Sequence, residues 1–143
     1  FSGALLNGRR PVVFEDGGQL RDFVHVSDIA RACVLAIERE DVKDVAINVG
    51  SGRPMNLLEL LNLLGREIPG ASSIQPEVLG RFREGDIRAC YADISRARAL
   101  LGFEPQVAIE EGVSALANWV RSQTILDRPV DPLQELNRYG LVR

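Results

Sequence analysis

The sequence predicts a small α/β fold, a mixed lobe of short strands and four to five helices. Three short apolar segments, 11–14, 22–26 and 45–49, have the length and pattern of strands. The longer segments between and after them show helical periodicity with recognisable caps. A chain of 143 residues can bury one real core, and its 45% hydrophobic and 26% charged residues are ordinary for a globular protein.

The first elements in chain order are a helix end and two strands. Residues 1–6 have the pattern of a helix already under way, and we interpret this abrupt start as that of a fragment of a larger protein. PVVF at 11–14 is a strand candidate, and EDGGQ after it is a turn with two glycines. DFVHV at 22–26 alternates, so that Phe23 and His25 share one face of a strand.

A helix is expected to follow from Ser27, its cap, to about Glu40. Its apolar face is predicted to hold Ile29, Cys33 and Ile37, beside Ala30 and Val34. VAINV at 45–49 is a candidate for a buried strand. Asn56 and Glu59 then predict a capping box for a leucine-rich helix, which is expected to pack on two sides or at an interface.

The last elements are mostly helical. Residues 69–86 form a long loop with room for one strand, and loops of this length are usually functional. Asp93 is expected to cap a short helix that stops at Gly102. Residues 109–123 predict an amphipathic helix. A final helix is expected to begin with Asp131 as its cap and Pro132 at its first position.

The composition argues against several classes of function. No apolar run approaches the roughly 20 residues of a membrane helix, and no secretory signal is visible. Two cysteines without metal-ligand spacing favour a reducing, cytoplasmic location, and a net charge of −3 argues against nucleic acid as a partner. A glycine-rich phosphate loop, a tyrosine–lysine pair and a metal cluster are all missing from the sequence. On its residues alone, the chain is a binding domain without a complete catalytic apparatus.

The stretch GQLRDFVHVSDIARA (18–32) contains the single histidine, His25, between two aspartates. A catalytic interpretation is tempting, but a lone histidine on the core face of a strand is more often structural. Asp28 is expected in the first helical turn, where the helix dipole favours it, and where it can orient His25. We therefore predict no catalytic residue in this chain.

Four motifs, taken in order, resemble a known family. They are EDGGQLRDFVHVSDIARA, INVGSGRPMNLLEL, REGDIRACYADISRARALLGFEP and EEGVSALANWV. The set is similar to the C-terminal half of NAD-dependent nucleotide-sugar epimerases and dehydratases, the extended short-chain dehydrogenase/reductases. UDP-galactose 4-epimerases and dTDP-L-rhamnose-type 4-epimerases belong to this family.

The resemblance implies a division of the chain and a larger protein around it. Residues 1–122 correspond to the nucleotide-sugar binding lobe of a Rossmann-type enzyme, and 123–143 to a helical tail outside the common core. The NAD-binding Rossmann domain, with its glycine-rich loop and catalytic Tyr-x-x-x-Lys pair, would precede Phe1 and is absent from this chain. The fragment alone is therefore expected to be inactive and not to retain NAD.

The resemblance also implies the residues that hold the substrate, a UDP- or dTDP-sugar. Arg21, in the motif RDF, corresponds to a diphosphate ligand, and the amides of the preceding glycine turn can approach the same anion. Arg83 corresponds to a second diphosphate ligand, and Asp86 to an acceptor for a ribose hydroxyl. Alternatively, Arg21 pairs with a neighbouring aspartate, and Arg83 forms a surface ion pair with Asp86.

The base and the sugar have implied contacts as well. Phe14 would stack on a pyrimidine while backbone groups around Val12 read its edge, unless Phe14 is an ordinary core residue. Cys90 stands where some relatives have a bulky tyrosine, which implies a roomier sugar pocket. Alternatively, Cys90 is a small buried hydrophobe.

Three functions remain open from the sequence. The first is the substrate-binding part of a nucleotide-sugar 4-epimerase or dehydratase, which orients the substrate while the N-terminal half transfers hydride. The second is a stand-alone sugar-nucleotide binding module. The third is an interaction domain that uses its leucine-rich helix as the face of a homodimer.

Overall fold

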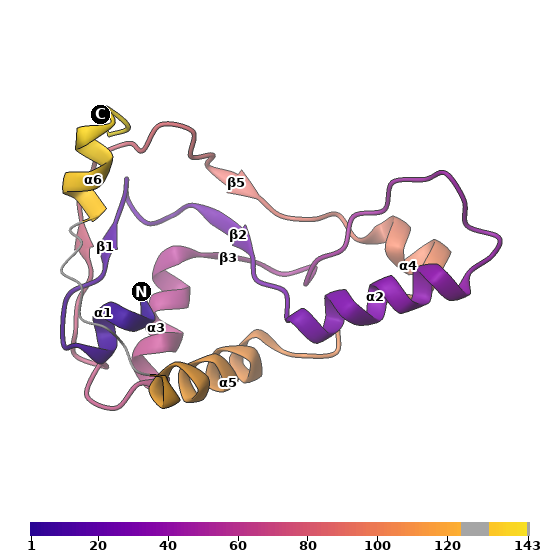
Figure 1. The fold of residues 1–143 in the computed structure, drawn as a ribbon, viewed down its shortest axis with the longest axis horizontal. Coiled ribbons are helices and arrows are strands. Elements are labelled where there is room, and N and C mark those ends of the chain that lie inside the picture. Colours follow the sequence, from indigo (N-terminus) through magenta and orange to yellow (C-terminus); the bar gives the residue numbers. More distant parts are fainter. Residues whose placement is uncertain (124–131, 143) are drawn as a thin grey trace. The chain divides into compact units, whose positions relative to one another are not determined.

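The computed structural model describes residues 1–123 and 132–142 (Figure 1). The chain divides into two compact units. Unit 1 comprises Phe1–Gln19, Asn56–Arg88 and Val113–Arg143, and unit 2 comprises Leu20–Met55 and Ala89–Gly112. Each unit combines helices with short strands, which confirms the predicted α/β class. Six helices lie in the described part of the chain, one more than the upper expectation.

Unit 1 contains a pair of parallel strands. β1 (Val12–Val13) pairs with β4 (Glu77–Val78), with Val12 opposite Glu77. The predicted strand at 11–14 is therefore shorter than expected, and the long loop does carry one strand. The helices assigned wholly or mostly to this unit are α1 (Ser2–Leu6), α3 (Leu57–Glu67), α5 (Ile109–Ser122) and α6 (Pro132–Arg138).

The leucine-rich helix α3 begins with the predicted capping box. The backbone N–H of Glu59 donates to Asn56 Oδ1 at 2.8 Å, and the N–H of Asn56 donates to Glu59 Oε2 at 3.0 Å. All six of its leucines are buried or half-buried, which confirms packing on more than one side of the helix. Leu61 and Leu64 are buried, as is Ile68 at its C-terminal end.

Unit 2 is built on a short sheet with two helices. β2 (Leu20–Asp22) is the middle strand of the order β3-β2-β5, where β3 is Pro54–Asn56 and β5 is Ala89–Cys90. α2 (Val26–Glu38) and α4 (Ser95–Leu101) lie side by side (Figure 1). Ala32, Ala97 and Phe103 belong to the core cluster that joins them.

The predicted strand at 22–26 is wrong in its extent. The strand ends at Asp22, whose carboxylate accepts the backbone N–H of Ala92 at 3.1 Å and so closes the ladder with β5. α2 starts at Val26, and its N-cap is His25 rather than Ser27. The Nδ1 atom of His25 accepts the backbone N–H of Ser27 at 3.3 Å.

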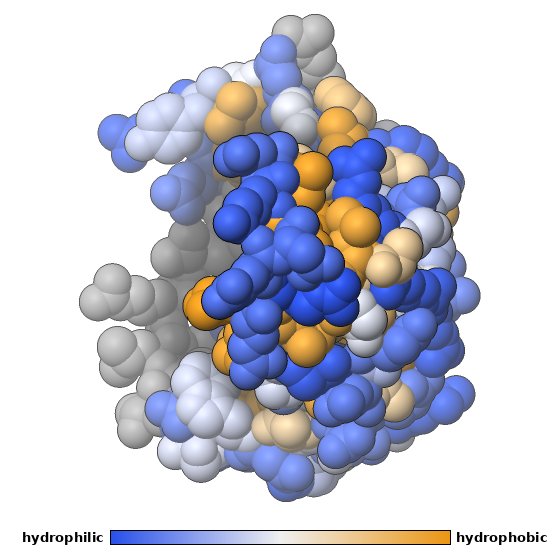
Figure 2. All heavy atoms as spheres, turned by 90° about the vertical axis from the view of Figure 1, so that its right-hand side faces the viewer, coloured by the Kyte–Doolittle hydropathy of each residue, from blue (hydrophilic) through white to orange (hydrophobic). Residues whose placement is uncertain are grey.

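The predicted apolar face of α2 is present, but most of it is exposed in this chain. Ile37 is 81% exposed and Val34 51% exposed, and Cys33 is exposed as well. The buried side carries Asp28 and Ala32 instead, because Asp28 is anchored to backbone amides further along the chain. Hydrophobic side chains consequently appear among hydrophilic ones on the face of the chain that carries α2 and α4 (Figure 2).

The segment 45–49 is not a strand. Ile47 and Val49 pack against the core cluster, but Val45 is 48% exposed. A strand needs a partner for its backbone groups, and none of the strands in the described residues pairs with this segment.

The helix ends in the second half follow the sequence more closely. Gly102 is the C-cap of α4, with φ +64°, as predicted. Asp93 accepts the N–H of Ser95 at 2.9 Å, one residue before the N-cap, Ile94. α6 begins at Pro132 as expected, while Asp131, its predicted cap, lies outside the described residues. No helix within 1–123 or 132–142 has the length and hydrophobicity to cross a membrane.

Candidate functional site

The glycine turn of unit 1 is held by Arg88, an arginine that the sequence analysis did not select. Asp16 accepts two bonds from Arg88, at 2.5 and 3.0 Å, and the backbone N–H of Gly18 at 2.9 Å. Arg88, followed by Gly18, lowers the pKa of Asp16 far below its usual range. The Gly18 amide, expected to approach a phosphate, therefore already has an anionic partner. Arg88 lies more than 70 positions from Asp16, so no local pattern signals the contact.

Phe14 precedes this turn, and two other residues fix its surroundings. The side-chain amide of Gln19 donates to the carbonyl oxygen of Phe14 at 3.0 Å. Gln19 is fully buried, and its Oε1 atom has no hydrogen-bond partner among the described residues. The guanidinium carbon of Arg83 lies 5.7 Å from the centre of the Phe14 ring. Phe14 is half-buried, so it is not the ordinary core residue of the alternative interpretation.

Arg83 and Asp86 form an ion pair, which is the contact that the alternative interpretation of these residues predicts. Arg83 Nη2 lies 3.1 Å from Asp86 Oδ2, and the N–H of Asp86 donates to the carbonyl of Arg83 at 3.0 Å. Gly85 between them has φ +85°, a conformation that suits glycine and turns the loop back on itself. The Arg83 side chain is 46% exposed and that of Asp86 is 12% exposed. The structure thus brings Phe14, Arg83 and Asp86 together within unit 1.

Val12 contributes backbone rather than side chain to this region. The carbonyls of Pro11 and Val13 accept the N–H groups of Glu77 and Leu79, at 2.8 and 2.9 Å. Successive residues of a strand direct their backbone groups to opposite edges. Any reading of a base edge by this strand therefore depends on Val12, because its two neighbours already pair with β4.

Arg21 and Cys90 are neighbours in unit 2. They occupy paired positions of β2 and β5, so their side chains share one face of the sheet. Arg21 Nη1 donates to the carbonyl of Leu20 at 2.8 Å. Cys90 is exposed, which contradicts the interpretation of it as a buried hydrophobe.

Asp22, next to Arg21, joins two other segments of unit 2 through its carboxylate. Asp22 accepts the N–H groups of Ser51 and Ala92, at 2.7 and 3.1 Å. A Cβ atom on Gly50 would lie 2.3 Å from Asp22 Oδ2, so this close approach requires glycine. The motif RDF is thereby tied to the motif VGSG, a link that no spacing in the sequence reveals.

Asp28 does not orient His25 as expected. Its carboxylate accepts the backbone N–H groups of Gln106 and Val107 at 3.0–3.1 Å, and Arg31 Nη2 lies 2.7 Å away. Burial raises the pKa of Asp28, but Arg31 and the two amides outweigh it, and the pKa lies below its ordinary value. His25 bonds to Ser27 instead, which supports its predicted structural role. In the described part of the chain, no three His, Cys, Asp or Glu side chains are grouped to hold a metal ion.

Comparisons with known proteins decide the family. The sequence model of the family described as GDP-mannose 4,6 dehydratase matches residues 3–116. The chain belongs to this family. It is a member of the extended short-chain dehydrogenase/reductases, as the four motifs predict. A curated relative, the dTDP-L-rhamnose 4-epimerase of Burkholderia thailandensis, is 35% identical over 116 residues, which are 81% of this chain and 31% of that protein.

Solved structures of the family share the fold. The UDP-N-acetylglucosamine 4-epimerase of Methanobrevibacter ruminantium, in complex with UDP-N-acetylmuramic acid, has a TM-score of 0.76 and 34% identity over 86% of this chain and 38% of its own. The UDP-glucose 4-epimerase of Bifidobacterium longum, in complex with NAD+ and UDP, has a TM-score of 0.69 and 28% identity over 85% of this chain and 38% of its own. The chain spans about a third of the length of the curated relatives that it matches, from 30% to 38%.

Proposed function

We propose that the chain is the substrate-binding part of an NAD-dependent nucleotide-sugar 4-epimerase or dehydratase, in which Phe14, Arg83 and Asp86 hold the nucleoside diphosphate. The observation that carries the proposal is the position of the Arg83 guanidinium. It lies 5.7 Å from the centre of the Phe14 ring and 3.1 Å from the Asp86 carboxylate. A cation, an aromatic face and a hydroxyl acceptor are the groups that a diphosphate, a base and a ribose require.

The ion pair of Arg83 is one that a diphosphate can replace. In the pair Arg83–Asp86, the arginine is 46% exposed, so solvent screens it and the pair contributes little to stability. A charge-assisted bond from arginine to a phosphate oxygen is about twice as strong as a neutral hydrogen bond. On binding, Arg83 turns from Asp86 to the diphosphate, and Asp86 becomes available to accept a ribose hydroxyl.

The binding site of the nucleobase is assigned to the ring of Phe14 and the backbone of Val12. Stacking of a base on an aromatic ring is worth about 1–3 kcal/mol. The bond from buried Gln19 to the Phe14 carbonyl fixes the backbone at this position, so the ring is held in place before the ligand arrives. Such preorganisation lowers the entropy that binding must overcome.

Arg21 is assigned as a ligand of the diphosphate, and Cys90 as a residue that lines the sugar pocket. Their shared face on β2 and β5 gives one cation beside one small side chain. A small, exposed Cys90 leaves room for a bulky group on the sugar. The complex of a homologous epimerase with UDP-N-acetylmuramic acid supports a substrate of this size.

The exposed face of α2 is assigned as the surface that contacts the rest of the protein. Val26, Val34 and Ile37, 75%, 51% and 81% exposed, recur with helical spacing and form one apolar stripe with Ala30 and Cys33. The relatives are more than twice as long as this chain. We therefore assign the stripe to the N-terminal half, which also carries the NAD site and the hydride transfer.

The test is calorimetric titration of UDP and dTDP into the full-length protein that contains this chain. Arg83→Ala is expected to weaken binding by about 1.5–3 kcal/mol, the range for hydrogen bonds to charged groups. Arg81→Ala is the matched control, because Arg81 is an exposed arginine on the same loop. Unchanged affinity in Arg83→Ala, or an equal loss in Arg81→Ala, would remove the diphosphate assignment.

A further inference from the structure

The end of the chain pairs with the loop that carries Arg83. The backbone N–H of Glu84 donates to the carbonyl of Leu141 at 2.7 Å, and Arg83 forms an antiparallel bridge with Val142. Both partners belong to unit 1. The family model ends at residue 116, so this contact comes from a segment that the family match does not include.

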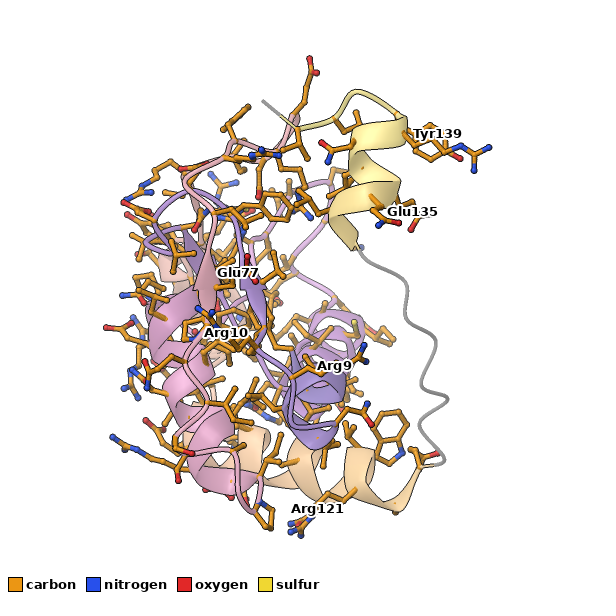
Figure 3. All side chains as sticks on the ribbon, turned by 90° about the vertical axis from the view of Figure 1, so that its left-hand side faces the viewer. Arg9, Arg10, Glu77, Arg121, Glu135 and Tyr139 are labelled. Carbon is orange, nitrogen blue, oxygen red and sulfur yellow. The ribbon has the colours of Figure 1, made fainter. Side chains whose placement is uncertain are left out.

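A tight turn after α6 brings the chain end into this position. The N–H groups of Gly140 and Leu141 donate to the carbonyls of Asn137 and Leu136, both at 3.0 Å. Gly140 has φ +66°, which reverses the chain so that Leu141 reaches the loop. Glu135 and Tyr139 of α6 point away from the rest of unit 1 (Figure 3), so the backbone pairing at 141–142 is the contact of interest.

Other backbone hydrogen bonds hold the loop at its start and within itself. Its start is held by Glu15, whose N–H donates to the carbonyl of Arg81 at 2.9 Å. The bond from Asp86 to the Arg83 carbonyl lies inside the loop and does not fix it to its surroundings. Gly85 gives the loop backbone more conformational freedom than another residue would. The pairing with residues 141–142 acts directly on the backbone of Arg83 and Glu84.

We infer that residues 132–142 form a positioning element for the diphosphate site: they hold the backbone at 83–84 so that the Arg83 side chain stays near Phe14, within reach of the diphosphate. This inference rests on the proposed function of Arg83. Restraining the backbone of one residue corresponds to about a 5- to 30-fold change in an equilibrium constant. Removal of the pairing should weaken diphosphate binding by this factor and leave binding of the nucleoside unchanged.

Two variants of the full-length protein remove the pairing in different ways. Deletion of residues 141–143 takes away the Leu141 carbonyl and leaves α6 intact. Gly140→Val keeps the chain length but disfavours the turn, because a β-branched residue rarely adopts positive φ. A Cβ atom there would meet nothing within 4 Å, so the strain comes from φ alone. Gly140→Asn, which tolerates this conformation, and Tyr139→Ala, at an exposed position, are the matched controls.

The measurement is the Kd for UDP and for uridine, with Arg83→Ala combined with each variant. The inference predicts a 5- to 30-fold loss for UDP alone in both test variants, and no further loss once Arg83 is alanine. Equal losses of affinity for UDP and uridine in the test variants would overturn the inference, as would losses that add to that of Arg83→Ala. Unchanged UDP binding in the test variants would also overturn it, provided that Arg83→Ala itself weakens UDP binding. Unchanged UDP binding in Arg83→Ala itself would overturn the proposed function, and the inference with it.

Discussion

Asp28→Ala is expected to destabilise the protein more than any change at its exposed ion pairs. Asp28 is 1% exposed, and its carboxylate accepts hydrogen bonds from Arg31 and from the backbone amides of Gln106 and Val107. Alanine removes the acceptor of two part-buried N–H groups, at up to about 1–3 kcal/mol each, and removes a partner of Arg31. The expected loss is about 3–5 kcal/mol, the range for breaking a buried charged pair. That is a large fraction of the stability of a typical domain.

Urea denaturation followed by circular dichroism measures this loss. Asp41→Ala is the matched control, since Asp41 also pairs with an arginine, Arg39, but is 69% exposed. Little or no change is expected from the control, because surface pairs are screened. If the two variants shift the urea midpoint equally, the account of Asp28 as a buried anchor is refuted.

The pH dependence of the same unfolding gives a second reading of Asp28. The pKa of the folded state lies below the ordinary value of 3.8. The contribution of Asp28 to stability is therefore complete above the unfolded pKa, and it is lost as the pH falls through the folded pKa. Below about pH 4, the free energy of unfolding should fall less steeply in Asp28→Asn than in the unchanged protein. Parallel pH profiles for the two proteins would contradict this sign.

Two further substitutions test the assignments in unit 2. Cys90→Tyr should reduce kcat/KM selectively for nucleotide sugars with a bulky 2-substituent, because the added ring fills the space beside Arg21, at a typical cost of about 1–3 kcal/mol; equal losses for compact and bulky sugars, with a lower melting temperature, would refute this. Ile37→Glu should lower the thermal stability and NAD content of the full-length protein by disrupting the packing on α2, an effect of about 2 kcal/mol; Ala36→Glu, exposed but off the stripe, is its control, and equal behaviour of the two variants would argue against the interface.

Much of the fold could be predicted because its signals are local. The capping box of Asn56 and Glu59 needs only two residues three apart, and the C-cap at Gly102 needs only one. The spacing of Arg83 and Asp86 through Gly85 likewise allows their contact without any knowledge of the rest of the chain. These local signals were placed correctly, whereas the cap of α2 was predicted at Ser27 and is His25.

The failures have distant causes. Helical periodicity shows that α2 has an apolar stripe, but it cannot say which side is covered within this chain. That choice depends on Asp28 and its two acceptor bonds to amides about 80 positions away. A buried aspartate with an exposed isoleucine on the same helix reverses the usual order of burial, and only the identity of the distant partners explains it.

The failed strand prediction at 45–49 also depends on a partner that is distant in the sequence. Its composition is that of a strand, and the prediction assumed that a partner strand existed. A strand is stable only when its backbone groups are paired, and no described strand pairs with it. The same assumption underlies the exposed stripe on α2, which has the pattern of a buried surface without a covering element. The stripe has a physical explanation under the proposed function, in which α2 carries apolar surface for the N-terminal half of the enzyme, whereas Ile47 and Val49 pack against the core of unit 2. The comparison of Ile37→Glu with Ala36→Glu therefore tests this explanation of the stripe directly.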